Sequence, residues 1–245
     1  MTEESRESRL NLSSIGVEAL DDPATDPRLV TRMLHDIARS NRWLGGTDAV
    51  RYALARLLLP EHRGRDLTLF DVGTGAADLP LAARRWANRH GFSLVPLALE
   101  RIPAAARLAR DAGVPVILGC AGELPLRNRS VDIVLVSQVA HHLDRDSATR
   151  LFAAASAVAR LGVIVADLRP MLLAATGFRL AGMALGFHRN TLADGVTSIR
   201  RSFRPDDLRQ LCADAGANDV RVASRPGARV VAWWHTAGIV ASHAS

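Results

Sequence analysis

The stretch LTLFDVGTGAADLP, residues 67–80, joins an apolar run, an acidic residue and a glycine-rich turn. The apolar run 67–72 predicts a buried strand that carries Asp71 near its end. Gly73 and Gly75 then predict a tight turn before a helix. This order places a carboxylate and exposed backbone N–H groups at the carboxyl edge of a first parallel strand, and in open α/β sheets nucleotide-like ligands bind at that edge.

Predicted strands and helices alternate from this stretch onward. Strands are expected at 67–72, 93–99, 115–118, 131–137 and 163–167, with helices at 76–89, 103–112 and 147–159, then a helix at 205–215 and strands at 219–223 and 228–234. Such alternation is typical of βαβ units in a parallel sheet, whereas two strands joined by a short turn must be antiparallel. The predicted fold class is α/β, a Rossmann-like, doubly wound, mostly parallel seven-stranded sheet with an antiparallel C-terminal hairpin and an N-terminal helical cap.

The chain is expected to divide into two parts. Residues 1–65 form an N-terminal arm and a helical cap, with helices predicted at 28–44 and 48–59, and residues 66–245 form a ligand-binding domain. The polar, partly acidic N-terminus lacks the basic start and apolar run of a signal peptide. Together with only two widely separated cysteines, this predicts a cytoplasmic protein without disulfides.

An insertion at 169–203 interrupts the alternation with an apolar helical piece, 171–187, followed by a polar loop. The apolar piece is not predicted to span a membrane, because it is short and Arg179 stands at its middle. We interpret it as a lid over an apolar pocket. A dimer contact and a peripheral membrane contact remain compatible with the same pattern.

The composition excludes several classes of enzyme. The 245 residues have 48% apolar content and a formal net charge of +6, and every basic residue apart from histidine is an arginine. Without lysine the chain cannot form a Schiff base with pyridoxal phosphate, and it lacks the lysine of a phosphate-binding loop. The two cysteines fit no metal-binding spacing, so no metal is expected.

The glycine turn itself restricts the ligand. A dinucleotide-binding turn needs a small residue at its third conserved place, where this chain has Asp78. An aspartate there would face a pyrophosphate with a negative charge. A ligand that carries an ammonium or a sulfonium fits this turn better.

These residues resemble the first motif of class I S-adenosylmethionine-dependent methyltransferases, and are similar to the ubiquinone/menaquinone methyltransferase-like and small-molecule (phenolic and polyketide) methyltransferases. Further stretches follow in family order: LALER at 97–101, GCAGELPLRNRSVD at 119–132 and VSQVAHHL at 136–143. The resemblance covers 66–168 well, and 204–235 by architecture. It implies that S-adenosylmethionine is the cosubstrate.

The resemblance also implies a set of donor-binding residues. These are Asp71, Gly73, Gly75, Asp78, Glu100, Arg101, Ala121, Gly122, Glu123, Ser137 and Gln138. The glycines let the backbone approach the methionine part of the donor, the two aspartates face its amino group, and Glu100 has two oxygens for the ribose hydroxyls. Cys120 departs from the family, which often has Asp or Asn there, so the adenine contact is expected to move to the backbone or to Glu123.

His141 and His142 follow the fourth strand and are the predicted catalytic residues. The order VAHHL is similar to the segment that holds the catalytic histidine of phenolic O-methyltransferases, so His141 is our first candidate for the general base and His142 the second. His188 and Arg200 in the insertion are weaker candidates for acceptor contacts. The expected acceptor is an apolar small molecule with a phenolic, quinol or polyketide-derived hydroxyl.

Other functions stay open at this point. C-methylation of a quinone-type ring needs no strong base, a dinucleotide-dependent oxidoreductase is disfavoured by Asp78, and a non-catalytic donor-binding protein would bind the donor without turnover. A nucleic-acid acceptor is not expected, because SQVAHH at 137–142 replaces the run that base methyltransferases carry there and aromatic residues are few.

Overall fold

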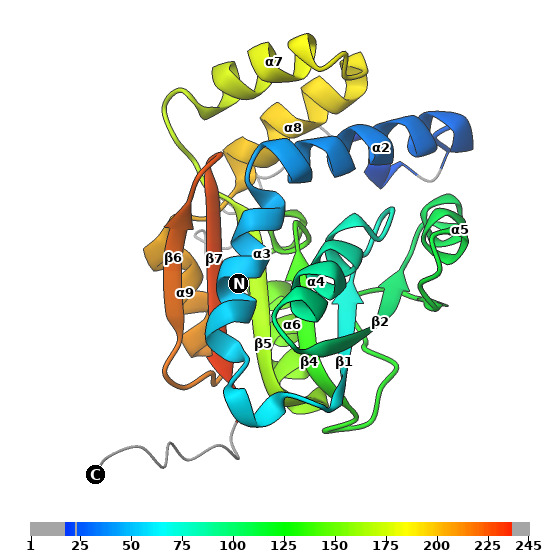
Figure 1. Ribbon diagram of the computed structural model, residues 1–245. Coiled ribbons are helices and arrows are strands. Elements are labelled where there is room, and N and C mark those ends of the chain that lie inside the picture. Colours follow the sequence, from blue (N-terminus) through cyan, green and yellow to red (C-terminus); the bar gives the residue numbers. More distant parts are fainter. Residues whose placement is uncertain (1–17, 23, 237–245) are drawn as a thin grey trace, which may run out of the picture.

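The computed structural model describes residues 18–22 and 24–236, so most of the predicted arm lies outside the described residues (Figure 1). Its strands are β1 (Asp66–Val72), β2 (Ser93–Glu100), β3 (Val116–Leu118), β4 (Val131–Ser137), β5 (Ala159–Leu168), β6 (Arg221–Arg225) and β7 (Arg229–His235). In the described part of the chain they form one seven-stranded sheet in the order β3-β2-β1-β4-β5-β7-β6. The first five are parallel, and β7 runs antiparallel to β5 and β6, which confirms the predicted fold class.

Helices cover both faces of the sheet. They are α2 (Pro27–Trp43), α3 (Gly46–Leu57), α4 (Asp78–Arg89), α5 (Pro103–Asp111), α6 (Arg145–Val158), α7 (Ala174–Ala184), α8 (Arg189–Arg201) and α9 (Pro205–Asp214), with short 3-10 turns η1 (Ala19–Asp21), η2 (Pro60–His62) and η3 (Ala140–His142). In Figure 1, α3 and α4 lie in front of the sheet, and α6 and α9 lie behind it.

The central strand β4 shows why the sheet is buried on both sides. All seven of its residues are buried. Ile133 and Leu135 pack with α3 and α4, whereas Val134 and Val136 pack with α6 on the opposite face. Successive side chains of a strand point to opposite faces, so a strand between two helical layers is apolar on both faces along its central residues, here 133–136.

The two N-terminal helices have different roles. Asp26 caps α2 by accepting a hydrogen bond from the backbone N–H of Arg28, and Pro27 fits the first helical position. The helix then runs across the carboxyl end of the sheet (Figure 1). The second helix, α3, differs from the cap expected for it, because its buried stripe, including Val50 and Leu54, packs directly on β5 and β7.

The insertion at 169–203 is a pair of helices, α7 and α8, and the polar loop predicted after residue 187 was wrong. The His188 side chain caps α8 by accepting from the backbone N–H of Asn190. Asp36 of α2 is fully buried and accepts hydrogen bonds from the backbone N–H of His188 and the hydroxyl of Thr191. These polar contacts hold α8 against α2. The polar composition of this segment predicted an exposed loop, because composition does not show which polar residues are paired.

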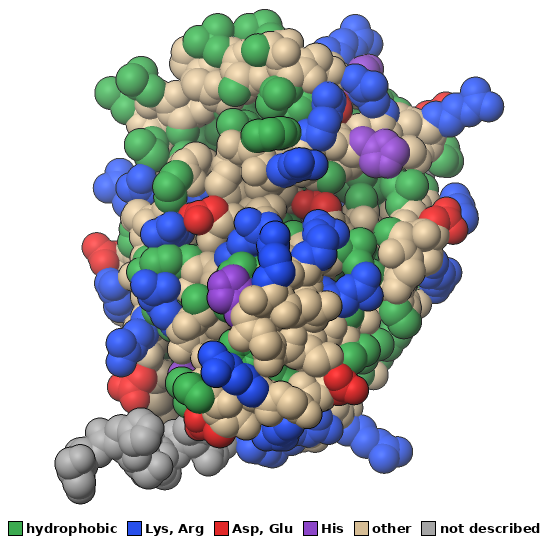
Figure 2. Space-filling view, viewed as in Figure 1, with side chains coloured by type: hydrophobic (Ala, Val, Ile, Leu, Met, Phe, Trp, Pro, Cys, Tyr) green, Lys and Arg blue, Asp and Glu red, His purple; other side chains and the backbone are tan. Residues whose placement is uncertain are grey.

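The outer side of α7 and the segment before it carry apolar side chains without cover. Met171, Leu172, Leu173, Leu180 and Met183 are all exposed, and Leu172 is 98% exposed. Figure 2 shows hydrophobic side chains gathered over this upper end of the molecule. No helix in the described ranges is both long enough and apolar enough to cross a membrane.

Candidate active site

A cavity of about 450 Å³ opens at the carboxyl ends of β1, β2 and β4. The strand order reverses between β1 and β4, which is the switch point where open α/β sheets bind their ligands. The floor comes from the glycine turn and the strand ends. The upper wall comes from α2 and from residues of α8, including Thr191, Ser198 and Ile199.

The glycine turn is held in a conformation that few other residues could adopt. Gly73 has φ +73°, and a Cβ there would lie 2.5 Å from Cγ2 of Val139. Its backbone N–H donates to the carbonyl of Leu99 over 2.8 Å, which ties the turn to the end of β2. The backbone therefore approaches the cavity directly at this point.

Glu100 lies at the end of β2 and organises the same turn. It is buried; its Oε2 accepts from the backbone N–H of Gly75 over 2.8 Å and its Oε1 from that of Ile102 over 2.9 Å. Each carboxylate oxygen can accept more than one hydrogen bond. The side chain is thus fixed in place and retains acceptor capacity at the cavity that it lines.

Two aspartates, the buried Asp71 and the half-buried Asp78, make the donor side of the cavity acidic. Burial raises the pKa of Asp71 to about 7, and the nearby charges of Asp78 and Glu100 add to this shift. Burial also raises the pKa of Asp78, although Asn41 Nδ2 donates to its Oδ2 over 3.1 Å. No group in the described chain bonds to Oδ1 of Asp71, so a cationic ligand would find an uncompensated acceptor there.

A network that the sequence analysis did not find supports these acids. Asn41 Oδ1 accepts from Gln138 Nε2 over 2.9 Å, and Gln138 Oε1 accepts from Nη1 of Arg229 over 3.0 Å. Arg229 is buried, and burial lowers its pKa to about 10. A lone arginine inside the apolar run ARVVAWW, 228–234, was the available signal for it.

His141 forms a buried pair with Asp167, another residue that was not predicted for the site from the sequence. The Nδ1 of His141 lies 2.6 Å from Oδ1 of Asp167, and its backbone N–H donates to Oδ2 over 3.3 Å. Burial raises the pKa of Asp167, but the charge of His141 and the hydrogen bond from it outweigh burial and hold that pKa below its usual value. The Nε2 of His141 is buried and has no hydrogen-bond partner in the described chain, so a lone pair faces the cavity.

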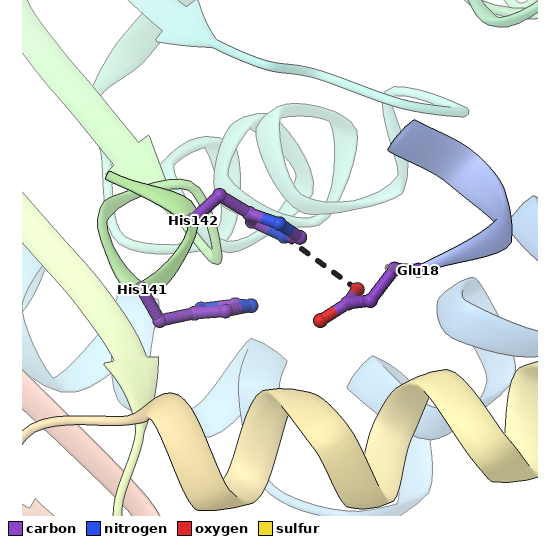
Figure 3. A group of neighbouring side chains, drawn as sticks. All are labelled: Glu18, His141 and His142. Atoms are coloured by element: carbon purple, nitrogen blue, oxygen red, sulfur yellow. Dashed lines mark ion pairs between the residues drawn. The ribbon is translucent and has the colours of Figure 1, made fainter. Parts of the chain in front are cut away.

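His142 and Glu18 stand beside this pair (Figure 3). The Nε2 of His142 lies 3.7 Å from Oε2 of Glu18, and the rings of His141 and His142 are 4.2 Å apart. Glu18 is buried, and its Oε1 accepts from the hydroxyl of Ser198 over 2.8 Å. In the sequence Glu18 lies in the predicted N-terminal arm, where no site residue is expected.

The other predicted site residues divide into two groups. Arg101, Ala121, Ser137 and Gln138 line the cavity, as does Cys120. Gly122 and Glu123 are exposed and lie outside the cavity lining, so in this structure Glu123 does not reach the place expected for the adenine contact.

The two weaker acceptor candidates also lie outside the cavity. His188 faces its own helix as the cap of α8, and Arg200 is exposed. The helical turn explains this placement, because Ser198 and Ile199 point inward and the next residue therefore points away.

Comparisons with known proteins agree with the overall fold. A family described as "Methyltransferase domain" matches residues 70–166. A solved S-adenosylmethionine-dependent methyltransferase from Aquifex aeolicus superposes with a TM-score of 0.59 at 16% identity, over 86% of this chain and 98% of that one. Human N-acetylserotonin methyltransferase, solved with S-adenosylmethionine, gives 0.58 at 16% identity, over 84% of this chain and 55% of that one.

A protein from Nostoc punctiforme with a proposed O-methyltransferase activity gives a TM-score of 0.55 at 14% identity, over 81% of this chain. This chain spans 59% of the length of that protein. No curated protein sequence matches this chain. At such identities the solved structures establish the fold alone. The class of reaction, methyl transfer, is indicated by the matched domain.

Proposed function

We propose that this chain, which is a class I S-adenosylmethionine-dependent methyltransferase, transfers the methyl group of that donor to the hydroxyl of an apolar small molecule. The enzyme class and the donor are confirmed by the matched domain, and the architecture by the solved structures. The hydroxyl acceptor rests on one observation above the others, the buried pair of Asp167 and His141 with Nε2 open to the cavity.

The residues around the glycine turn fit the donor. Gly73 leaves room where a side chain would collide, and Oδ1 of Asp71, which has no partner among the described residues, is an acceptor for a positively charged amino group. We assign the ribose hydroxyls to Glu100. The adenine edge is assigned to the backbone of Ala121 beside Cys120, because both line the cavity and a thiol is a weak acceptor.

His141 is the group that we assign to proton removal. Asp167 accepts a hydrogen bond from the Nδ1–H of His141, which keeps the Nε2 lone pair available and stabilises the imidazolium that forms. The acceptor oxygen loses its proton to Nε2 and forms a bond to the methyl carbon as the carbon–sulfur bond breaks, leaving a neutral thioether. The buried position of His141 keeps water from competing, and much of the rate can come from alignment of the two reactants.

The acceptor is assigned to the side of the cavity formed by α8. Ile199 and Phe178 line it with apolar surface, and α7 and α8 together are the lid that we propose for residues 169–203. The direct test is a screen of phenols and quinols with isotopically labelled donor. Donor binding without methylation of any acceptor would contradict the proposed reaction.

The lid assignment predicts a selective effect of Ile199→Ala. Loss of this apolar contact should raise KM for the acceptor about tenfold, while donor affinity measured by calorimetry stays unchanged. Leu172→Ala is the matched control, because Leu172 is almost fully exposed and outside the cavity lining. Equal KM values for the two variants would show that α8 does not contact the acceptor.

The acidity of Asp71 predicts a pH dependence of donor binding. The carboxyl has a pKa of about 7 in the free protein, and only its ionised form attracts the donor's amino group. Affinity should therefore rise about tenfold from pH 6 to pH 8, with proton release at the lower pH. Calorimetry on Asp71→Asn supplies the control, because the donor's own amino group titrates equally for both proteins. The same pH profile for both would contradict the assignment.

A further inference from the structure

Two imidazoles and a carboxylate converge beside the cavity. One ligand atom from each of Glu18, His141 and His142 lies within 4.8 Å of the others (Figure 3). The three side chains come from distant parts of the chain, because Glu18 precedes η1 and the histidines belong to η3. Nothing in the assigned reaction requires Glu18.

His141 already has the surroundings of a metal ligand. Its Nε2 is buried, faces the group and has no hydrogen-bond partner in the part of the chain that the structure describes. Its Nδ1 is held by Asp167 at 2.6 Å. Histidines that bind metals commonly donate their other ring N–H to a carboxylate, which fixes the tautomer and the ring orientation.

Glu18 is oriented by groups on α8. The hydroxyl of Ser198 donates to its Oε1 over 2.8 Å, and Nη1 of Arg201 lies 3.9 Å from the same oxygen. The other oxygen, Oε2, is therefore the one turned toward His142. Arg201 already offsets part of the carboxylate charge. The site therefore favours a metal ion that binds well to imidazole nitrogen over one that binds mainly to anionic oxygen.

We propose that Glu18, His141 and His142 bind one Zn²⁺ ion, with a remaining coordination position toward the cavity. Two imidazoles and one carboxylate are a donor set that zinc accepts, and three protein ligands are typical of zinc sites with an open position. With zinc–nitrogen bonds of about 2.0–2.1 Å, tetrahedral ligands lie about 3.3 Å apart. The side chains must close by up to roughly 1.5 Å on this geometry, which the exposed His142 can supply while His141 stays fixed.

The functional consequence rests on the proposed role of His141 as base. A zinc ion would occupy the Nε2 lone pair that proton removal needs, so the metal-bound protein is an inhibited form and the metal-free protein is the active one. This assignment differs from the expectation of no metal, which followed from cysteine spacing alone. The proposed ligands are the two histidines of the motif VAHHL and the carboxylate of Glu18, which lies outside that motif.

The test is a titration of the untagged, chelator-treated full-length chain with Co²⁺ as a spectroscopic probe, followed by displacement with Zn²⁺. We expect one equivalent of Co²⁺ to give visible bands of four- or five-coordinate metal. Glu18→Gln and His142→Asn should each weaken binding at least tenfold, and His141→Asn should abolish it. His35→Asn is the matched control, because His35 is exposed on α2.

Two results would overturn the proposal. The first is weak binding that His35→Asn reduces as much as His142→Asn does, with thermal unfolding showing that all variants are folded. The second is full methylation activity with zinc bound at one equivalent. The binding measurement needs no acceptor, so it decides the metal site even where no acceptor is methylated and the proposed reaction itself fails.

Discussion

Replacement of His141 by asparagine is expected to lower kcat for methylation of a phenolic hydroxyl by roughly 10²- to 10⁴-fold, the range typical of a lost general base. Donor affinity should change less than threefold, because the side chain lies beyond the glycine turn that we assign to the donor. Asparagine is chosen because it fills part of the imidazole volume and can still bond to Asp167. Single-turnover kinetics with labelled donor, beside calorimetry, separates the two quantities.

Asp167, the hydrogen-bond partner of His141, supplies a second variant for comparison. Asp167→Asn keeps the shape of the pair but removes the charge that stabilises the imidazolium, so kcat should fall and the pKa seen in the pH profile of kcat should shift downward. A residue with a purely structural role would leave that pKa unchanged. His35→Asn serves as the unaffected control, since His35 is exposed on α2.

Activity that survives in both His141→Asn and His142→Asn would contradict general-base catalysis. In that case alignment of the reactants would account for the rate, and C-methylation of an electron-rich ring would be the better assignment, because carbon needs no proton removed before attack. The position of the label in the product distinguishes a methyl on oxygen from one on carbon.

The sequence indicated His141 but not Asp167, and the reason is physical. The histidine belongs to a local motif after β4, whereas the aspartate is the last residue but one of the neighbouring strand β5. Only the parallel pairing of β4 with β5 brings the two strand ends together. The sequence predicted a mostly parallel sheet without the order of its strands, and a pair of atoms 2.6 Å apart also depends on side-chain orientation that strand periodicity does not determine.

The fold was predictable where one face of an element is consistently apolar. The buried run of β4 and the alternation around it predicted a mostly parallel sheet, and the short turn predicted the antiparallel hairpin. Prediction failed for α8, because its polar residues bond to Asp36 of another helix and so resemble an exposed loop. Glu18 and Arg229 were missed for the same reason, since each is a polar residue whose partners lie far along the chain.

Glu100→Ala is expected to weaken donor binding by roughly 10- to 100-fold, because hydrogen bonds to a charged acceptor contribute about 1.5–3 kcal/mol. The buried carboxylate already accepts from the backbone N–H groups of Gly75 and Ile102. The variant thus loses both a ligand contact and an anchor of the glycine turn. Calorimetry with S-adenosylhomocysteine measures the total effect, and Glu61→Ala is the control for loss of an exposed acid.

A double-mutant cycle that combines Glu100→Ala with removal of a ribose hydroxyl separates the ligand contact of Glu100 from its support of the glycine turn. The 2′-deoxy and 3′-deoxy forms of S-adenosylhomocysteine each lack one ribose hydroxyl, so wild-type protein should bind them more weakly than the parent, whereas Glu100→Ala should hardly distinguish the three. A purely structural role of Glu100 in the turn predicts equal losses for every ligand. Coupling confined to the hydroxyls would place the carboxylate against the ribose, and the absence of coupling would withdraw that assignment while leaving the carboxylate as the support of Gly75.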